Sequence, residues 1–167
     1  MKMTRGATLV MIAVGVTLVG AAVTYVFTTP YNRIAGVRLG GAGTPAPSDW
    51  RTVNNTGIIQ LKVGGFPPFV INVAYSATEE GIITATRPDG GYWAERARNN
   101  PAGWLRIGDN SYRMTATEIV EDGERIAMLE SYGAKNRMSM DVPASGGVIQ
   151  GEAEPLRTWE VFFWTPR

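Results

Sequence analysis

The chain has 167 residues, of which 16 are lysine or arginine and 15 are aspartate or glutamate, and it contains neither cysteine nor histidine. The lack of cysteine excludes a disulfide framework and a thiolate metal site, and the lack of histidine removes the usual general base and the usual metal ligand. Catalysis by a Ser-His-Asp or Cys-His arrangement is therefore excluded, and we expect no metal site. The nearly balanced charge does not indicate a nucleic-acid-binding protein.

The N-terminal part of the chain is expected to form a segment of its own. Residues 6–29 carry no charged side chain, and as a helix of ~1.5 Å per residue this run is long enough to cross a hydrocarbon layer of ~30 Å. Tyr25 and Phe27 lie near its end, where aromatic rings favour the membrane interface. We therefore predict a single-pass transmembrane anchor in the cell membrane over residues 1–30. The alternative is a cleaved signal peptide, with residues 19–21 as a loose cleavage site.

The region after this anchor has a different composition. Basic residues flank the apolar run on both sides, so the positive-inside rule does not assign the globular part to one side of the membrane. Residues 31–50 are rich in glycine, proline and small polar side chains, which predicts a linker that packs no core. We expect one folded domain over residues 51–167.

Short runs of β-branched and aromatic residues dominate this domain and are typical of strands. Turn residues between the first three runs predict consecutive hairpins, whereas two other segments have helical spacing. We expect strands at residues 56–63, 69–77, 81–87, 103–109, 111–121 and 158–166, and helices at residues 91–99 and 123–138. This order without βαβ units predicts a mainly β fold, a small antiparallel barrel with helices on its outside.

Several of these segments together resemble one known family. An aromatic-rich helix ending in RNNP is followed by GWLRIGDNSYRMTATEI, by a helix beginning GERIAM, and by a final strand closing in TPR. This pattern resembles the deazaflavin-dependent nitroreductase family, whose members are split β-barrels related to flavin-binding pyridoxamine-phosphate-oxidase-like proteins. The resemblance extends from Gly57 to Arg167 and is strongest over residues 81–128. It implies a split β-barrel that binds coenzyme F420 or FMN.

The first hairpin departs from the family pattern. In that family its loop has the type Arg-Lys-Ser/Thr-Gly-Lys-Pro-Arg and helps to hold the cofactor, whereas this chain reads KVGGFPPF over residues 62–69. Only Lys62, Gly64, Gly65 and Pro67 match that type. The resemblance therefore implies cofactor contacts at Lys62, Gly64 and Gly65, and the missing arginines leave the identity and the binding of the cofactor open.

A second candidate site lies where a predicted strand turns into the first helix of the domain. Arg87 there precedes Asp89, Gly90 and Gly91, and a guanidinium beside free backbone N–H groups is an arrangement that binds phosphate. The resemblance implies the same corner, since the tail of the family's cofactor lies near this loop. Pro-Asp-Gly-Gly is also an ordinary turn, and Asp89 as a helix cap would oppose an anion, so both interpretations stay open.

Aromatic residues follow this corner and also precede it. Tyr92 and Trp93 offer flat faces to a fused ring system, or else pack on the barrel. Residues 66–69 form an apolar loop that would line a substrate path, touch the bilayer, or serve only as a rigid connection. Arg96 and Arg106 are expected to face solvent.

The predicted function follows from the resemblance. It is a membrane-anchored nitroreductase-like or quinone-reductase-like oxidoreductase, which transfers hydride from a reduced deazaflavin or flavin to a small apolar acceptor such as a quinone or nitro compound. The cofactor performs this chemistry while the protein supplies positioning, and the proton would come from Tyr92, Tyr75 or solvent. The alternative is a non-catalytic split barrel that binds an apolar ligand or a partner at the membrane. We expect the lipid bilayer as a partner and no nucleic acid, and a homodimer stays open.

Overall fold

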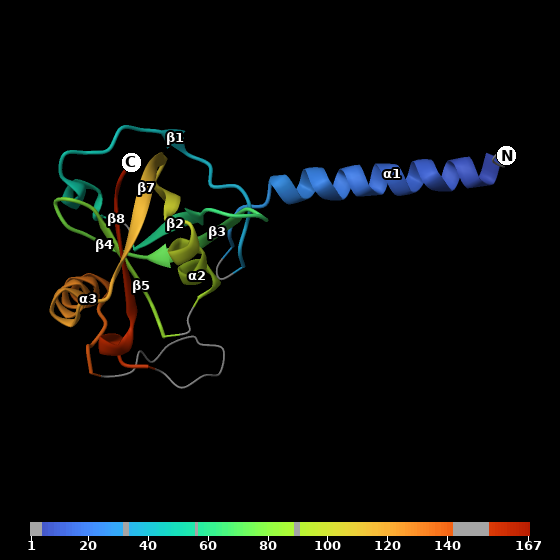
Figure 1. Ribbon diagram of the computed structural model, residues 1–167. Coiled ribbons are helices and arrows are strands. Elements are labelled where there is room, and N and C mark those ends of the chain that lie inside the picture. Colours follow the sequence, from blue (N-terminus) through green and yellow to red (C-terminus); the bar gives the residue numbers. More distant parts are fainter. Residues whose placement is uncertain (1–4, 32–33, 56, 89–90, 142–153) are drawn as a thin grey trace.

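The structure is a computed structural model that describes residues 5–31, 34–55, 57–88, 91–141 and 154–167. Over these residues it consists of a long N-terminal helix, a curled antiparallel sheet and two further α-helices that lie against the sheet (Figure 1). The curled sheet has the form of a split β-barrel. The predicted fold class is therefore confirmed.

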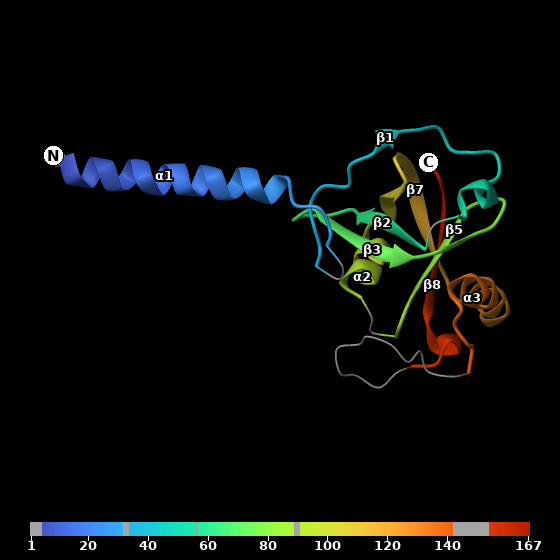
Figure 2. The same ribbon diagram turned by 180° about the vertical axis from the view of Figure 1, so that it is seen from behind.

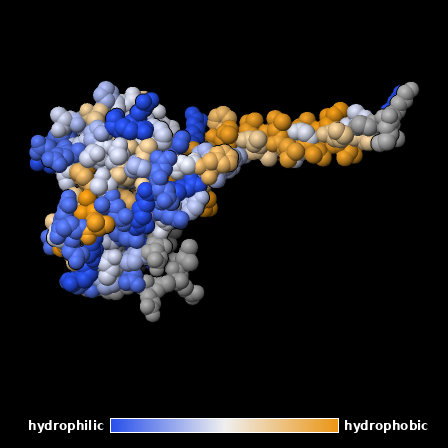
Figure 3. Space-filling view, viewed as in Figure 1, coloured by the Kyte–Doolittle hydropathy of each residue, from blue (hydrophilic) through white to orange (hydrophobic). Residues whose placement is uncertain are grey.

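The N-terminal helix α1 (Arg5–Val26) has 22 residues, and none of them is buried. Apolar side chains cover most of its visible surface (Figure 3). By length and composition this helix is able to cross a membrane, and a signal sequence would have the same properties. α1 projects away from the barrel in both ribbon views (Figures 1 and 2). It is thus a candidate membrane span.

The sheet contains eight strands within the described residues. They are β1 (Ala42–Gly43), β2 (Ile58–Val63), β3 (Phe69–Ala74), β4 (Ser76–Ala77), β5 (Ile82–Thr86), β6 (Ala102–Ile107), β7 (Asn110–Ile119) and β8 (Glu160–Pro166). Their order is β3-β2-β6-β7-β8-β5-β4, and all neighbours on this path are antiparallel. The short β1 pairs in parallel with β7.

Successive residues of a strand point to opposite sides, which gives each strand an inner and an outer face. In β2, Ile59, Leu61 and Val63 are buried, while Gln60 and Lys62 are partly exposed. The same alternation occurs in β6 and β7. Polar and charged side chains of these three strands therefore collect on the outside of the barrel.

Two clusters of buried side chains hold the sheet and the helices together. The first fills the barrel and includes Trp93, Ala94 and Ala97 of helix α2 (Tyr92–Asn99). The second joins helix α3 (Asp122–Asn136) to β5, to β8 and to the short helix η2 (Leu156–Thr158). Its buried members are Ile83, Ala85, Ile119, Leu129, Tyr132, Leu156 and Val161.

The run expected as a single strand over residues 69–77 is two strands, β3 and β4, separated at Tyr75. β3 pairs with β2 as far as Ala74, and β4 pairs with β5 from Ser76, so the strand is interrupted where its partner changes. β3 and β4 lie at opposite ends of the strand order. This single run therefore joins the two edges of the sheet and curls it into a barrel.

Both helices of the domain begin within one residue of their predicted positions. Glu121 caps α3, since its carboxylate accepts hydrogen bonds from the backbone N–H groups of Gly123 and Glu124 at 3.0 and 2.6 Å. The cap predicted for α2, Asp89, lies outside the described residues. Gly91 occupies the N-cap position of α2, with no side-chain cap.

The region expected as a linker contacts the barrel along the segment from residue 34 to residue 50, which we call the connecting segment. Gly36 exchanges two backbone hydrogen bonds with Val70 of β3, at 2.8 and 2.9 Å, and β1 pairs with β7. Leu39 is nearly buried, and Trp50, at the start of the short helix η1 (Trp50–Val53), is fully buried in the barrel core. A free tether would make none of these contacts.

Arg106 helps to hold the connecting segment against the barrel. We expected this side chain to face solvent, but its guanidinium donates hydrogen bonds to the carbonyl groups of Gly108 and Leu39 at 2.9 and 3.3 Å. Gly40 lies against this guanidinium with a φ of 70°, a left-handed conformation that glycine adopts without strain. Glycine thus serves here to shape the backbone beside Arg106.

The centre of the core gives a first prediction. Trp164 is fully buried, and its indole N–H donates a hydrogen bond of 2.8 Å to the hydroxyl of Thr84, which is buried as well. Thr84→Val keeps the shape but leaves a buried donor without a partner, so it should lower the free energy of unfolding by ~1–3 kcal/mol. Thr84→Ser retains the acceptor and serves as the control. Chemical denaturation of the full chain in detergent measures both, and a valine variant as stable as the parent would contradict the prediction.

Candidate functional site

Lys62 is the predicted site residue around which the structure builds a distinct surface. It lies on the outer face of β2 opposite Trp104 of β6, and Trp104 lies opposite Arg113 of β7. Arg167 follows β8, and its backbone N–H donates to the Arg113 carbonyl at 3.1 Å. Four strands thus place three cations and one indole in a continuous line, which we call the cationic row: Lys62, Trp104, Arg113 and Arg167.

The cationic side chains of this row approach the indole. The Lys62 Nζ lies 5.3 Å from the centre of the Trp104 ring, and the guanidinium carbon of Arg167 lies 5.4 Å from it. Within the described part of the chain, Lys62, Arg113 and Arg167 form no ion pair with a carboxylate. The row is therefore a positive surface whose charge is available to a bound anion.

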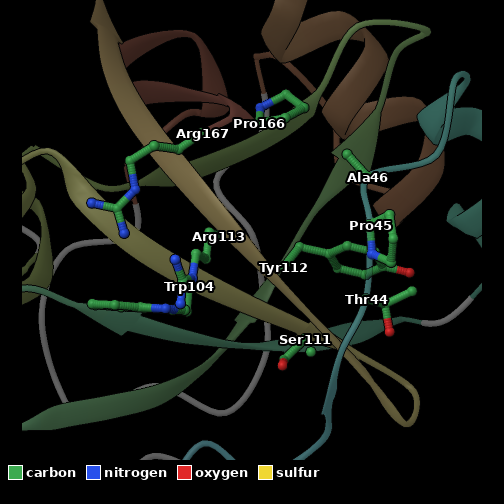
Figure 4. A pocket seen from close by; sticks show the side chains of 10 residues that line it. Thr44, Pro45, Ala46, Trp104, Ser111, Tyr112, Arg113, Pro166 and Arg167 are labelled. Atoms are coloured by element: carbon green, nitrogen blue, oxygen red, sulfur yellow. The ribbon is translucent and has the colours of Figure 1, made fainter.

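A cavity of about 500 Å³ adjoins the cationic row (Figure 4). The sheet lines it with Trp104, Tyr112 and Arg113, and the connecting segment lines it with Thr44 and Pro45. Its volume falls in the range of small-molecule sites, ~300–1,000 Å³. A ligand there would meet a flat indole, guanidinium groups and a hydroxyl, a combination that suits an aromatic ring joined to a phosphate.

Part of this row could be predicted from the sequence. The β6–β7 hairpin turns at Gly108, whose φ is 59°, and Asp109, so Trp104 and Arg113 must face each other across it. Lys62 and Arg167 come from strands whose neighbours depend on the whole topology. Their approach to Trp104 therefore required the structure.

The predicted corner at Arg87 is described only in part. Arg87 follows β5 and is partly buried, and within the described residues its guanidinium makes no hydrogen bond or ion pair. Gly91 packs on Trp93, since a Cβ at Gly91 would lie 3.0 Å from the indole Cδ1. Gly90 lies outside the described residues. The phosphate interpretation of this corner stays a prediction.

Lys62 and Arg87 belong to different parts of the barrel. Thr86, which precedes Arg87, pairs with Glu160 at the start of β8, whereas the cationic row meets β8 beside Arg167 at its other end. The length of β8 separates these ends by roughly 20 Å, at ~3.3 Å per residue. The predicted residues therefore do not converge on a single site.

The two aromatic residues at the start of α2 have opposite environments. Trp93 is only 7% exposed, and its ring centre lies 5.0 Å from that of Phe162 in the core. Tyr92 is 55% exposed and meets Phe69 edge to face at 4.9 Å between ring centres. Trp93 is thus a core residue, and Tyr92 is the member of the pair that is accessible to a ligand.

The hairpin loop with Gly64 and Gly65 lies against α2. A side chain at Gly64 would collide with Asn100, and Gly65, with a φ of 108°, lies beside the guanidinium of Arg96. Arg96, which we expected to face solvent, donates a hydrogen bond of 2.7 Å to the Pro67 carbonyl, and its guanidinium carbon lies 4.4 Å from the centre of the Tyr92 ring. These two glycines therefore allow the loop and the helix to pack closely.

Several ionisable groups with shifted pKa values lie away from these candidate sites. Arg98 binds Glu118 and Glu160, and its hydrogen bond with Glu118 is the main cause that raises its pKa. Burial raises the pKa of Tyr132 to about 12. Tyr75, a predicted proton donor, is buried, and its hydroxyl donates to the Val53 carbonyl at 2.6 Å. Of the two tyrosines considered as donors, only Tyr92 is exposed.

Lys135 lies against the break between β3 and β4. Its Nζ donates a hydrogen bond of 3.0 Å to the Tyr75 carbonyl and lies over the Tyr75 ring. Burial lowers the pKa of Lys135 to about 8. The folded chain therefore binds the Lys135 proton less tightly than the unfolded chain does, whose lysines have a pKa of ~10.4.

This difference predicts a pH dependence of stability. Between about pH 8 and pH 10 the unfolded chain holds more protons at this lysine, so the free energy of unfolding should rise with pH and level off below pH 8. Lys135→Met should remove this rise, as measured by denaturation of the full chain at a series of pH values. Above pH 10 the raised pKa of Tyr132 acts in the opposite direction. An unchanged slope in the methionine variant would refute the assignment.

Comparison with known proteins yields similarity of fold only. No protein-family model matches the chain, and no curated protein matches its sequence. Among solved structures, a candidate 5-nitroimidazole antibiotic resistance protein from Bacteroides thetaiotaomicron has 9% identity and a TM-score of 0.51, covering 68% of this chain and 75% of its own. An FAD-binding protein from Mesorhizobium loti has 12% identity and a TM-score of 0.50, covering 69% and 84%.

A third solved structure is slightly less similar. This candidate pyridoxamine 5'-phosphate oxidase from Listeria innocua has 13% identity and a TM-score of 0.49, covering 68% of this chain and 86% of its own. The two matches with TM-scores of 0.50 and 0.51 show that the chain shares a barrel fold with those proteins. They do not transfer a ligand or a reaction.

Proposed function

We propose that this protein is a membrane-anchored split-barrel oxidoreductase that binds a flavin or deazaflavin nucleotide and reduces a small apolar acceptor such as a quinone or nitro compound. The observation that supports this function best is the cationic row beside a cavity of about 500 Å³. The barrel fold is shared with an FAD-binding protein and with a candidate nitroimidazole resistance protein. FMN and coenzyme F420 are the specific cofactors that we consider.

The residues present fit such a nucleotide. Arg113 and Arg167 offer planar guanidinium groups, which bind phosphate through paired N–H donors, and neither forms an ion pair within the described chain. Trp104 provides a face for a fused ring, and Lys62 adds charge next to it. The bound cofactor would supply the hydride. The barrel would orient it, and the wall formed by Thr44 and Pro45 would limit access of water.

One observation favours a second candidate function, a non-catalytic split barrel that binds an apolar ligand or a partner at the membrane. The hairpin loop lacks the arginines of the nitroreductase pattern, and Gly64 and Gly65 lie against Asn100 and Arg96 of α2. A loop that packs in this way leaves less room for a cofactor. The bilayer is a proposed partner under both functions, the apolar acceptor only under the first, and a homodimer stays a prediction.

The cationic row gives a direct test. Arg113→Gln keeps a polar but shorter side chain and removes its charge, so it should weaken binding of FMN, FAD or coenzyme F420 by roughly tenfold, since a charge-assisted hydrogen bond contributes ~1.5–3 kcal/mol and this side chain is exposed. Titration of the full chain in detergent at fixed low salt measures the change. Higher salt should weaken nucleotide binding by the parent more than by the variant, because only the parent has the Arg113 charge that salt screens.

The control for this titration is Arg137→Asn. Arg137 is an exposed cation at the end of α3, and asparagine tolerates its φ of 57°. If both substitutions weaken binding equally, overall charge and not the row is responsible. If the parent binds none of the three nucleotides, the non-catalytic function is the one that remains.

The Arg87 corner is tested in the same titration. If its guanidinium binds the phosphate, Arg87→Ala should weaken nucleotide binding by roughly ten- to a hundredfold, whereas Arg113→Gln should leave it unchanged. Arg96 does not serve as a control, because it holds the hairpin loop. Equal affinity of the Arg87→Ala variant and the parent would exclude this corner as the phosphate site.

A further inference from the structure

The end of α1 lies beside the tip of the β2–β3 hairpin in both ribbon views (Figures 1 and 2). Backbone hydrogen bonds connect the two. The Thr28 carbonyl accepts from the N–H groups of Val37 and Arg38 at 2.8 and 2.9 Å, and Gly36 exchanges hydrogen bonds with Val70 at 2.8 and 2.9 Å. The position of the hairpin relative to the end of α1 is therefore determined by the fold.

Gly36 makes this connection possible. A Cβ at this position would collide with the backbone of Thr29 and Pro30 and would lie 2.8 Å from the Thr28 carbonyl oxygen. Such contacts are with main-chain atoms, which cannot turn away as a flexible side chain would. A larger residue at Gly36 must therefore separate the hairpin from α1.

Large apolar side chains are exposed at this junction. Phe27 follows α1, Tyr31 and Ile34 lie in the turn after it, and Phe66 is in the hairpin loop. We call these four residues the junction patch, and they are 59% to 91% exposed. Phe66 has the highest value among the large hydrophobic residues of the described chain. Since Val70 is bonded to Gly36, Phe66 lies within roughly 13 Å of that contact, at ~3.3 Å per residue.

We propose that the junction patch lies in the lipid–water interface of the bilayer that α1 crosses, so that the barrel is seated on the membrane surface. The patch continues the apolar surface of α1 at the point where the helix meets the barrel (Figure 3). The amphipathic ring of Tyr31 is favoured at this depth, and Phe27 and Phe66 would bury apolar area there. Arg38, whose guanidinium carbon lies 5.4 Å from the centre of the Phe27 ring, is suited to lipid phosphates. The proposal depends on insertion of α1 and is independent of any cofactor.

The absence of cysteine makes the test specific, because one introduced thiol can be labelled alone. Phe66→Cys in the full chain is labelled with a polarity-sensitive fluorophore and reconstituted into phosphatidylcholine vesicles. The control is Val120→Cys, since Val120 is 78% exposed and precedes α3, on the far side of the barrel from α1 (Figures 1 and 2). Carbonate extraction shows separately whether α1 is inserted.

The expected result is a blue-shifted emission at position 66, with weak quenching by aqueous iodide and strong quenching by spin labels attached to lipid headgroups. The fluorophore at position 120 should behave as in water. Adding Gly36→Val to Phe66→Cys should restore the aqueous emission at position 66 while the chain still resists carbonate extraction.

Three results would overturn the proposal. Aqueous emission at position 66 in a chain that resists extraction would mean that the barrel does not touch the membrane. Protection from iodide without quenching by lipid-borne labels would mean that another protein surface covers the patch. Release of the chain by carbonate would mean that α1 is not inserted, so that the junction does not lie at a bilayer.

Discussion

The curl of the split barrel depends on the run from residue 69 to residue 77, whose two strands form opposite edges of the sheet. Contacts at the break at Tyr75 hold these two edges in place. Lys135 and Asn136 of α3 donate hydrogen bonds to the Tyr75 carbonyl at 3.0 and 3.1 Å, and the Tyr75 hydroxyl donates to Val53. A buried carbonyl at a change of strand partner needs donors from outside the sheet, and α3 supplies them. The position of α3 on the barrel follows from this requirement.

The filled interior of the curled sheet moves the candidate chemistry to the outside. The barrel core contains Trp164 and Trp93, and a ligand-sized cavity lies on the outer face, between the sheet and the connecting segment. Because inner and outer residues alternate, every cation on β2 or β7 that avoids the core must face outward. Lys62 and Arg113 do so on either side of Trp104. The same alternation that packs the core therefore assembles the cationic row.

The sequence predicted the secondary-structure elements better than the contacts between them. Strands and helices are local, so alternation and helical spacing located those of the barrel domain within about two residues, apart from the break at Tyr75. Tyr92 and Trp93 show the limit: neighbours on a helix point ~100° apart, and only the docking of α2 decides which one enters the core. Arg96 was misjudged for the same reason, since its partner Pro67 is distant in sequence. The family pattern groups Lys62 and Arg87, whereas register places Arg87 near the start of β8 and joins Lys62 to a row that meets β8 at its other end.

The connecting segment shows why composition alone did not predict its contacts with the barrel. Glycine and proline suit a flexible tether, yet small residues also let a backbone pack closely, as Gly36 does against residues 28–30 and Gly40 does against the Arg106 guanidinium. Such a segment packs on the barrel when it finds hydrogen-bonding partners there, and β3, β7 and Arg106 provide them. Residues 43–46 of this segment form one wall of the cavity beside Trp104. The chain that leads from the candidate membrane span is therefore part of the candidate site.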